Sequence, residues 1–364
     1  MNSRTASKGR LAAAVLLTAA APAGVLADTV LYTSSNASAG NAVIEIAQAD
    51  DGSLSIRGSY PTGGAGTDGG LGNQGAIALD GEFLFVINAG SDEVSSFRRL
   101  DTGLSLVSTV PSGGTRPVSL TVDRDVLYVL NAGSDSIAGF FISEEGALSP
   151  IAGSSRPLSG ANTAPAQISF TKDGRVLVVT ERATNRLVSF PVLRDGLTGP
   201  AQVVASPGQT PFGFAVTKGR RILVSEAAGG AAGASSVTAW RVSPHGNLSV
   251  LDPVEPTLQT AACWVAITPD GRYAFTTNTG SGTITAYRVR GDELSLVDPD
   301  GLAANTGAGS APIDMAISPD GRFLHSLNGG TDEIGSFRIG KDGSLTPVGT
   351  LAGLPDRATG LVSD

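Results

Sequence analysis

Two glutamates break a phrase that the sequence otherwise repeats. The phrase reads INAGSDEVSSF, LNAGSDSIAGF and LNGGTDEIGSF in three places, and its asparagine is replaced by Glu181 and Glu226 in two further copies. Carboxylates in neighbouring repeats could act as a general base on water, or could bind a divalent cation such as calcium with Asn278 and Asp314. The alternative is structural, because a glutamate can hold the same loop by hydrogen bonding as the asparagine does, with Glu181 paired to Arg182.

Two arginines occupy equivalent positions just before the first strand of two repeats. These residues are Arg116 and Arg357, and Asn73 stands at the corresponding position in the repeat between them. Two guanidinium groups that flank one sector of a site can clamp a carboxylate or a phosphate through their paired N–H donors. We therefore predict that these three residues bind an anionic substrate. The alternative is that both arginines are ordinary surface side chains.

The repeats themselves predict an all-β fold, a seven-bladed β-propeller. Each unit of about 40–50 residues contains four short runs rich in β-branched and aromatic residues, and Gly, Asp and Asn separate these runs. Turns such as PDGR and DGSL place glycine where a tight hairpin needs a positive φ, so their aspartates are expected to be turn residues rather than acids. The phrase position recurs seven times, at Ser35, Asn88, Asn131, Glu181, Glu226, Asn278 and Asn328.

The two ends of the repeat region complete one another. The first unit begins at TVLYTSS, which is a second strand without a first strand before it, and the chain ends in RATGLVSD, which is similar to the first strands of other units. We therefore predict that the C-terminal strand pairs into the N-terminal blade and closes the ring. Closure would also remove exposed sheet edges, which invite aggregation.

The alternation of side chains along each innermost strand predicts which residues face the central channel. In the predicted upper ring, Trp264 could stack on a ring-shaped substrate, although it could equally fill the channel by packing. Gln167 and Asp314 place polar groups at the same level, and we predict that all three contact the substrate. The upper ring comprises Ala76, Ser119, Gln167, Gly213, Trp264, Asp314 and Gly360, and the small, mostly apolar deeper ring comprises Ala78, Thr121, Ser169, Ala215, Ala266, Ala316 and Val362.

Other catalytic chemistries lack the residues that they need. His245 falls in a hairpin turn and His325 in a core-strand position, so neither supports a Ser-His triad, and no GxSxG motif is present. Cys263, the only cysteine, lies in the apolar run AACWVAI and is expected to be a buried core residue. No Cys/His spacing predicts zinc. We predict no cofactor, with a divalent cation such as calcium as the alternative.

The N-terminus predicts export. Three basic residues precede the apolar run LAAAVLLTAAAPAGVL, and we expect cleavage of residues 1–27 after Ala27. The net charge of −8 then becomes −11, because the removed segment carries three positive charges and no negative ones. An acidic surface repels nucleic acid, and no later segment could span a membrane. We predict a periplasmic or secreted monomer, with residues 28–364 as one domain and a small molecule as its ligand.

Three phrases carry a resemblance to a known family. SPDGRFLHSLNGGTDEIGSFRIGKDGSLTPVG, TPDGRYAFTTNTGSGTITAYRV and DVLYVLNAGSDSIAGFFI resemble the seven-bladed β-propeller lactonases, which include 6-phosphogluconolactonases of the propeller type and a carboxymuconate cyclase. The resemblance covers residues 28–364 and implies the fold and a lactone substrate. The histidine-bearing segments of the sugar lactonases are absent, because the comparable places read RPVSL, APAQI and TPFGF.

Two functions from different classes follow. The first is an exported lactone hydrolase that opens a sugar-type or carboxylated lactone at the channel mouth. It would use Glu181 or Glu226 as the base, Arg116 and Arg357 as anchors, and Trp264 as a wall. The second is a non-catalytic envelope or extracellular binding scaffold, because propellers host many unrelated functions.

Overall fold

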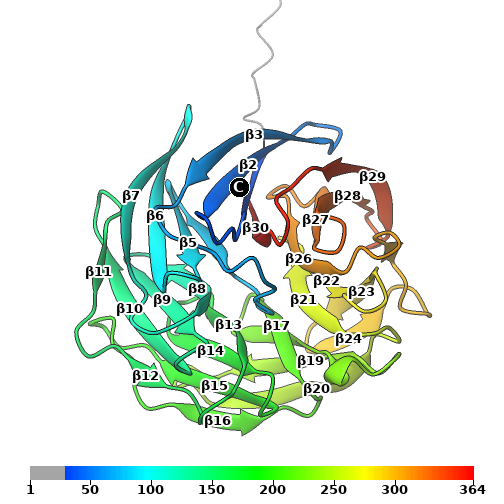
Figure 1. Cartoon of the computed structure of the whole chain (residues 1–364). Helices are drawn as coiled ribbons and strands as arrows, with labels where there is room; N and C mark the ends of the chain where they lie inside the picture. Colours follow the sequence, from blue (N-terminus) through cyan, green and yellow to red (C-terminus); the bar gives the residue numbers. More distant parts are fainter. Residues whose placement is uncertain (1–28) are drawn as a thin grey trace, which may run out of the picture.

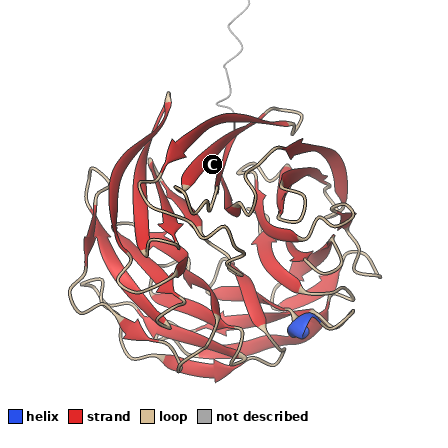
Figure 2. Ribbon diagram, viewed as in Figure 1, coloured by secondary structure: helices blue, strands red, loops and turns tan. Residues whose placement is uncertain are grey.

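The chain folds into seven antiparallel sheets arranged as a ring, which confirms the predicted propeller (Figure 1, Figure 2). The computed structural model describes residues 29–364. Each sheet is one blade, and the blades are numbered one to seven along the chain. Within the described residues, no helix is long and apolar enough to cross a membrane. The predicted export segment, residues 1–27, lies outside them.

The strands of each blade are numbered in order from the channel outward. Blade one contains β30 (Thr359–Ser363), β1 (Thr29–Ser34), β2 (Ala42–Gln48) and β3 (Leu54–Pro61). Blade two contains β4 (Ile77–Asp80), β5 (Phe83–Asn88), β6 (Glu93–Leu100) and β7 (Gly103–Pro111). Blade three contains β8 (Pro117–Asp123), β9 (Val126–Asn131), β10 (Ser136–Ile142), and a divided outer strand, β11 (Leu148–Pro150) and β12 (Arg156–Pro157).

The remaining four blades follow the same order. Blade four contains β13 (Pro165–Phe170), β14 (Val176–Glu181), β15 (Arg186–Pro191) and β16 (Gln202–Ala205). Blade five contains β17 (Pro211–Val216), β18 (Arg221–Glu226), the 3-10 turn η1 (Ala228–Gly230), β19 (Ser236–Val242) and β20 (Leu248–Pro256). Blade six contains β21 (Ala262–Ile267), β22 (Tyr273–Asn278), β23 (Thr283–Arg290), β24 (Glu293–Leu296) and β25 (Ala304–Asn305). Blade seven contains β26 (Pro312–Ile317), β27 (Phe323–Asn328), β28 (Glu333–Ile339) and β29 (Leu345–Ala352).

The core lies between blades, where the second strands are covered on both faces. In β9, which reads VLYVLN, every residue from Leu127 to Asn131 is buried, and β14 is buried along its whole length. Outer strands such as β3 expose most of their side chains instead. Strands buried on both faces read as continuous apolar runs, which is why these segments lack a polar alternation. Cys263 is buried in this core as a free thiol, as predicted.

The ring is closed by the chain ends. β30 pairs antiparallel with β1 inside blade one, with Leu31 opposite Ser363 and Tyr32 opposite Val362. The innermost strand of blade one therefore comes from the C-terminus and its other strands from the N-terminus. This confirms the predicted closure.

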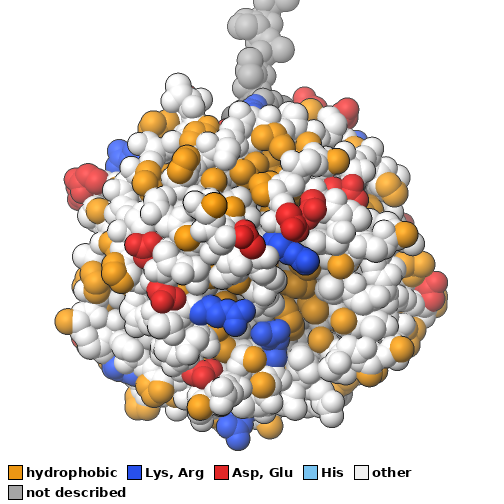
Figure 3. All heavy atoms as spheres, in the orientation of Figure 1, with side chains coloured by type: hydrophobic (Ala, Val, Ile, Leu, Met, Phe, Trp, Pro, Cys, Tyr) orange, Lys and Arg blue, Asp and Glu red, His pale blue; other side chains and the backbone are white. Residues whose placement is uncertain are grey.

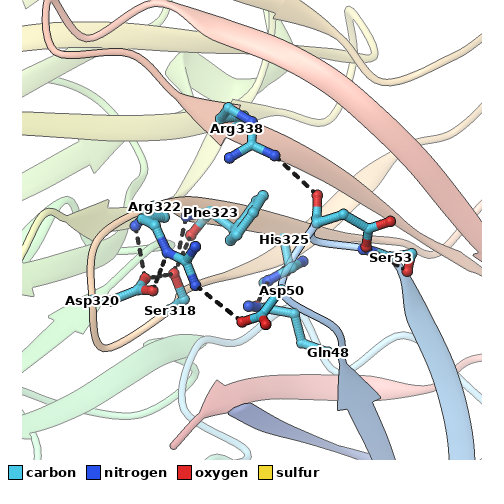
Figure 4. Close-up of polar contacts among 10 residues, drawn as sticks. Gln48, Asp50, Ser53, Ser318, Asp320, Arg322, Phe323, His325 and Arg338 are labelled. Atoms are coloured by element: carbon cyan, nitrogen blue, oxygen red, sulfur yellow. Dashed lines mark hydrogen bonds and ion pairs between the residues drawn. The ribbon is translucent and has the colours of Figure 1, made fainter. Parts of the chain in front are cut away.

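The joint between blades seven and one lies beside this closure (Figure 4). His325 on β27 is fully buried, with Nε2 2.6 Å from Gln48 Oε1 and Nδ1 3.1 Å from Ser336 Oγ. Burial lowers the pKa of His325 to about 4. Arg322 forms an ion pair with Asp320 on its own hairpin and reaches Asp50 across the joint at 3.8 Å.

The turn Asp51–Ser53 docks at the same joint. Asp51 Oδ1 accepts hydrogen bonds from the Ser53 N–H and hydroxyl, which confirms that this aspartate is a turn residue. Gly52 has φ +92°, and a Cβ at this position would lie 2.3 Å from the Phe323 ring. Glycine is needed here for the backbone conformation and for the close approach of the next blade.

Candidate functional site

The mouth of the channel is formed by the loops that lead into the innermost strands. In six blades one residue at the start of this strand has a φ between 43° and 64°, and β-bulges follow in five of them. Arg116 and Arg357 both occupy this position, so their predicted equivalence holds in the structure. The six residues are Arg116, Ala164, Thr210, Ala261, Ala311 and Arg357.

A short segment of blade two crosses the channel below this mouth. We call residues 71–75 the strap. The Gln74 N–H donates to Ala166 O of blade four at 3.0 Å, and the Gln74 carbonyl accepts from the Ser119 hydroxyl of blade three at 2.6 Å. The Gln74 side chain reaches blade six, where Nε2 donates to Val265 O at 2.9 Å. One residue is therefore bonded to three inner strands around the ring.

Asn73 fixes the strap to further strands. Its carbonyl accepts a hydrogen bond from Trp264 Nε1 at 2.7 Å, and its side-chain amide donates to Val118 O. Its Oδ1 lies 3.4 Å from the Thr359 hydroxyl of blade one. Asn73 is 3% exposed. The structure thus places this predicted substrate ligand in the floor of the mouth, with its polar atoms engaged by the protein.

The predicted upper-ring residues link neighbouring inner strands. Gln167 donates from Nε2 to Phe214 O at 3.0 Å, and its Oε1 accepts from the Phe214 N–H at 2.6 Å. Asp314 accepts the N–H of Leu361 at 3.1 Å, and burial raises the pKa of Asp314 to about 8. Trp264 is 4% exposed beneath Asn73. These residues are brought together as predicted, but their observed contacts are with the protein, and their role toward a substrate stays a prediction.

Arg182 is the group at the mouth with unused binding capacity. It follows β14, and its Nε donates to Ala164 O at 3.1 Å. Its guanidinium lies over the Phe212 ring, 5.1 Å from the centroid, and a Cβ on Gly72 of the strap would lie 2.7 Å from Nη1. The guanidinium is therefore held in a slot between an aromatic ring and a glycine.

The charge of Arg182 is not neutralised within the protein. Across residues 29–364, no carboxylate lies within ion-pair distance of it. Burial lowers the pKa of Arg182, and the positive charge of Arg116 lowers it further. Two guanidinium groups are therefore close to one another above the strap. A partly buried, unpaired cation beside a second cation is suited to hold an anion.

The surrounding surface is also suited to an anion. Lys and Arg side chains border the hollow near the middle of the face in Figure 3, and apolar side chains line part of its wall. Phe212 stacks on Trp264 with ring centroids 4.9 Å apart, so the aromatic wall beside Arg182 is continuous with the floor. Arg357 is exposed and forms an ion pair with the adjacent Asp356 at 3.4 Å. The clamp built by the structure thus joins Arg116 to Arg182, whereas the sequence paired Arg116 with Arg357.

Glu181 and Glu226 are both fully buried. Glu181 accepts hydrogen bonds from the Ser159 N–H and hydroxyl and from the Thr184 hydroxyl. Glu226 accepts from the Ser236 hydroxyl at 2.8 Å, and burial raises the pKa of Glu226 to about 7. Both carboxylates hold loops at the outer side of the second strands, which is the structural alternative that the sequence left open. Their catalytic role stays a prediction.

The repeated phrase carries the same structural work in other blades. Asn131 Oδ1 accepts from the Ser112 hydroxyl at 2.7 Å, and Asp135 accepts from the N–H groups of Asn162 and Thr163 in the loop that leads to blade four. Each copy of the phrase thus ties a blade to its neighbour. No group of three or more His, Cys, Asp or Glu side chains in the described part of the chain could hold a metal ion.

Sequence reasoning missed three residues of this site, Arg182 as a ligand-binding group, Phe212 and Gln74. Arg182 follows the first exception to the repeated phrase, and that was an available signal. Phe212 stands where other repeats have Val118, Ala166 or Cys263, so an aromatic residue at that position was a weaker one. Gln74 carries no signal, because its contact with Val265 joins positions 191 residues apart.

Comparisons with known proteins agree with this architecture. The family model described as "Lactonase, 7-bladed beta-propeller" matches residues 27–156, 80–231 and 226–355. Among solved structures, a candidate 6-phosphogluconolactonase from Bacteroides fragilis has 21% identity and a TM-score of 0.70, covering 94% of this chain and 100% of that one. The periplasmic gluconolactonase PpgL of Pseudomonas aeruginosa has 19% identity and a TM-score of 0.70, with coverages of 91% and 98%. No curated protein sequence matches significantly.

Proposed function

The chain belongs to the lactonase family of seven-bladed β-propellers, and on this basis we propose that it hydrolyses a lactone that carries an anionic group. The observation that supports this proposal most strongly is Arg182, which lies unpaired and partly buried beside Arg116 at the mouth of the channel. A carboxylate is the best match to the guanidinium fork, because two parallel N–H donors can meet its two oxygens. A phosphate presents the same chemistry.

The proposed reaction needs no cofactor. Water adds to the acyl carbon of the lactone, the ring C–O bond breaks, and the released oxygen takes a proton, so the product is a hydroxy acid. The oxygen of the carbonyl becomes negatively charged in the transition state, and a fixed cation near that oxygen lowers the barrier. In this proposal Arg182 holds the anionic group and Arg116, which is exposed at the mouth, stabilises the oxyanion. Phe212 forms the wall against which the lactone ring lies.

The test compares matched lactones. A neutral five-membered lactone and its carboxylated counterpart would be assayed with wild-type protein, with and without calcium. We expect only the carboxylated compound to turn over, and we expect Arg182→Met to lower kcat/KM about a hundredfold, the cost of about 3 kcal/mol expected for losing a buried charged partner.

A matched control is Arg124→Met. Arg124 also has a positive φ, its side chain is 78% exposed, and it follows the opposite end of β8. Turnover of the neutral lactone at the same rate, or equal effects of both substitutions, would contradict the anionic substrate class. Glu181→Gln and Glu226→Gln, assayed in the same way, separate the predicted base from the structural role, because only loss of a base abolishes kcat in a folded protein.

A second candidate is a binding protein without catalysis. It is favoured by the burial of both glutamates, which leaves the mouth without the base that the sequence predicted. This alternative predicts that a hydroxy acid or carboxylated lactone binds at the mouth and is recovered unchanged. Export of either form also stays a proposal, and N-terminal sequencing of the mature protein would test it by showing whether the chain starts at Asp28.

A further inference from the structure

The strap closes the channel at the level of the predicted upper ring. Asn73 and Gln74 together are bonded to inner strands of blades one, three, four and six. Beneath the strap lies a separate cavity of about 430 Å³, lined by residues that include Ala78, Thr121 and Ala316. The mouth is therefore a blind basin with the strap as its floor, and not the upper part of an open channel.

Gln74 takes the place of a missing ring residue. Gln167 bridges blades four and five by pairing its amide with both backbone groups of Phe214. Blade five offers Gly213 at the equivalent ring position and so lacks a side chain to bridge to blade six. Gln74 makes that bridge instead, because its Oε1 accepts from the Val265 N–H at 3.2 Å and its Nε2 donates to Val265 O at 2.9 Å.

The glycine at position 213 makes this arrangement possible. A Cβ on Gly213 would lie 2.1 Å from Gln74 Oε1, a distance that no real pair of such atoms adopts. The amide of Gln74 thus fills the space that a side chain of blade five would need. The backbone of the strap is drawn toward blade six as a result, and this also brings the Asn73 carbonyl to the Trp264 indole.

We propose that Gln74 is a positioning residue, which acts through the strap to hold Gly72 against the Arg182 guanidinium. Gly72 has φ +61° and forms one wall of the slot whose other wall is Phe212. Fixing that wall prevents the guanidinium from swinging into the channel and keeps its Nη atoms directed at the mouth. This inference rests on the proposed function, since it gives the strap a role in binding the anionic ligand.

The experiment compares two glutamine variants that lose the same kind of bond. Gln74→Ala removes the bridge made by the strap, and Gln167→Ala removes the corresponding bridge between regular inner strands. Each would be made in a Trp240→Phe background, because Trp240 and Trp264 are the two tryptophans of the chain. The three readouts are the free energy of unfolding, the Kd of a hydroxydicarboxylate such as citramalate, and the emission maximum of Trp264.

We expect both variants to lose comparable stability, because each loses two backbone-directed hydrogen bonds. Only Gln74→Ala should weaken the Kd, by about tenfold, and only Gln74→Ala should red-shift Trp264, whose indole loses its partner on Asn73. Gln74→Met keeps the side-chain volume and should reproduce both changes if the alanine variant does not fold.

Two outcomes overturn the inference. One is an unchanged Kd and Trp264 emission in Gln74→Ala and Gln74→Met, and the other is an equal loss of affinity in the Gln74 and Gln167 variants. Failure of the proposed function is read elsewhere, in a wild-type protein that neither binds the probe nor responds to Arg182→Met. The Trp264 signal needs no ligand, so it still reports on the strap in that case.

Discussion

Acid should weaken the joint between blades seven and one through His325. The fully buried imidazole lies between Gln48 and Ser336, with Asp320 as the nearest group that favours its protonation. Phe85 and Phe275 occupy the same strand position in other blades. His325→Phe therefore replaces the titrating group with a side chain that the repeat already uses there, and it removes the response of this joint to protons.

The magnitude follows from the difference in pKa between the two states. An unfolded histidine has a pKa of about 6.5, and in the fold the pKa of His325 is lowered to about 4. The neutral form is favoured by the fold, so its contribution is complete above pH 6.5 and is lost as the pH falls toward 4. Between pH 7.5 and pH 5 this amounts to about 2 kcal/mol.

The assay is urea unfolding of wild type and His325→Phe across this range of pH. At pH 7.5 we expect the variant to be less stable by about 1–3 kcal/mol, because Gln48 loses its buried partner. The gap should narrow by about 2 kcal/mol at pH 5. Other carboxylates titrate equally in both proteins and cancel in the difference. A gap that stays constant from pH 7.5 to pH 5 would show that protonation of His325 does not weaken the joint.

Two further predictions concern single buried groups. Glu226→Gln should stabilise the protein at pH 8, by on the order of 3 kcal/mol, because burial raises the pKa of Glu226 to about 7 and the fold disfavours its charge; the advantage should shrink as the pH falls toward 4.5, and pH-dependent unfolding without such a change would contradict this. Gly52→Ala should cost more stability than Gly271→Ala in thermal unfolding, because both have a positive φ but only Gly52 would place its Cβ against Phe323; equal losses would show that the clash is absorbed.

The fold was predictable because its determinants are local and recur. Strand runs, turn glycines and the phrase around Asn131 repeat in every blade, so errors in one repeat were corrected by the others. The closure by β30 was predictable for the same reason, since each chain end carries the half of a blade that the other lacks. The aspartate of the DG turns was also interpreted correctly, as Asp51 shows.

The site was less predictable because it depends on departures from the repeat. The alignment placed Trp264 and Gln167 correctly in one ring, but nothing local shows that a strap from blade two fills the space above them. Arg182 was noted only as a neighbour of Glu181, because its slot is built by Gly72 and Phe212 from two other blades. Such contacts between distant repeats leave no periodic signal in a single sequence.

Binding of an anion at the mouth through Arg182 underlies the proposed function, and a crystal structure with a bound hydroxydicarboxylate is its sharpest test. We predict a carboxylate that accepts hydrogen bonds from the Nη atoms of Arg182, above Asn73 and beside Phe212. A ligand in the cavity beneath the strap, or one bound at the mouth without contact to Arg182, would contradict this prediction.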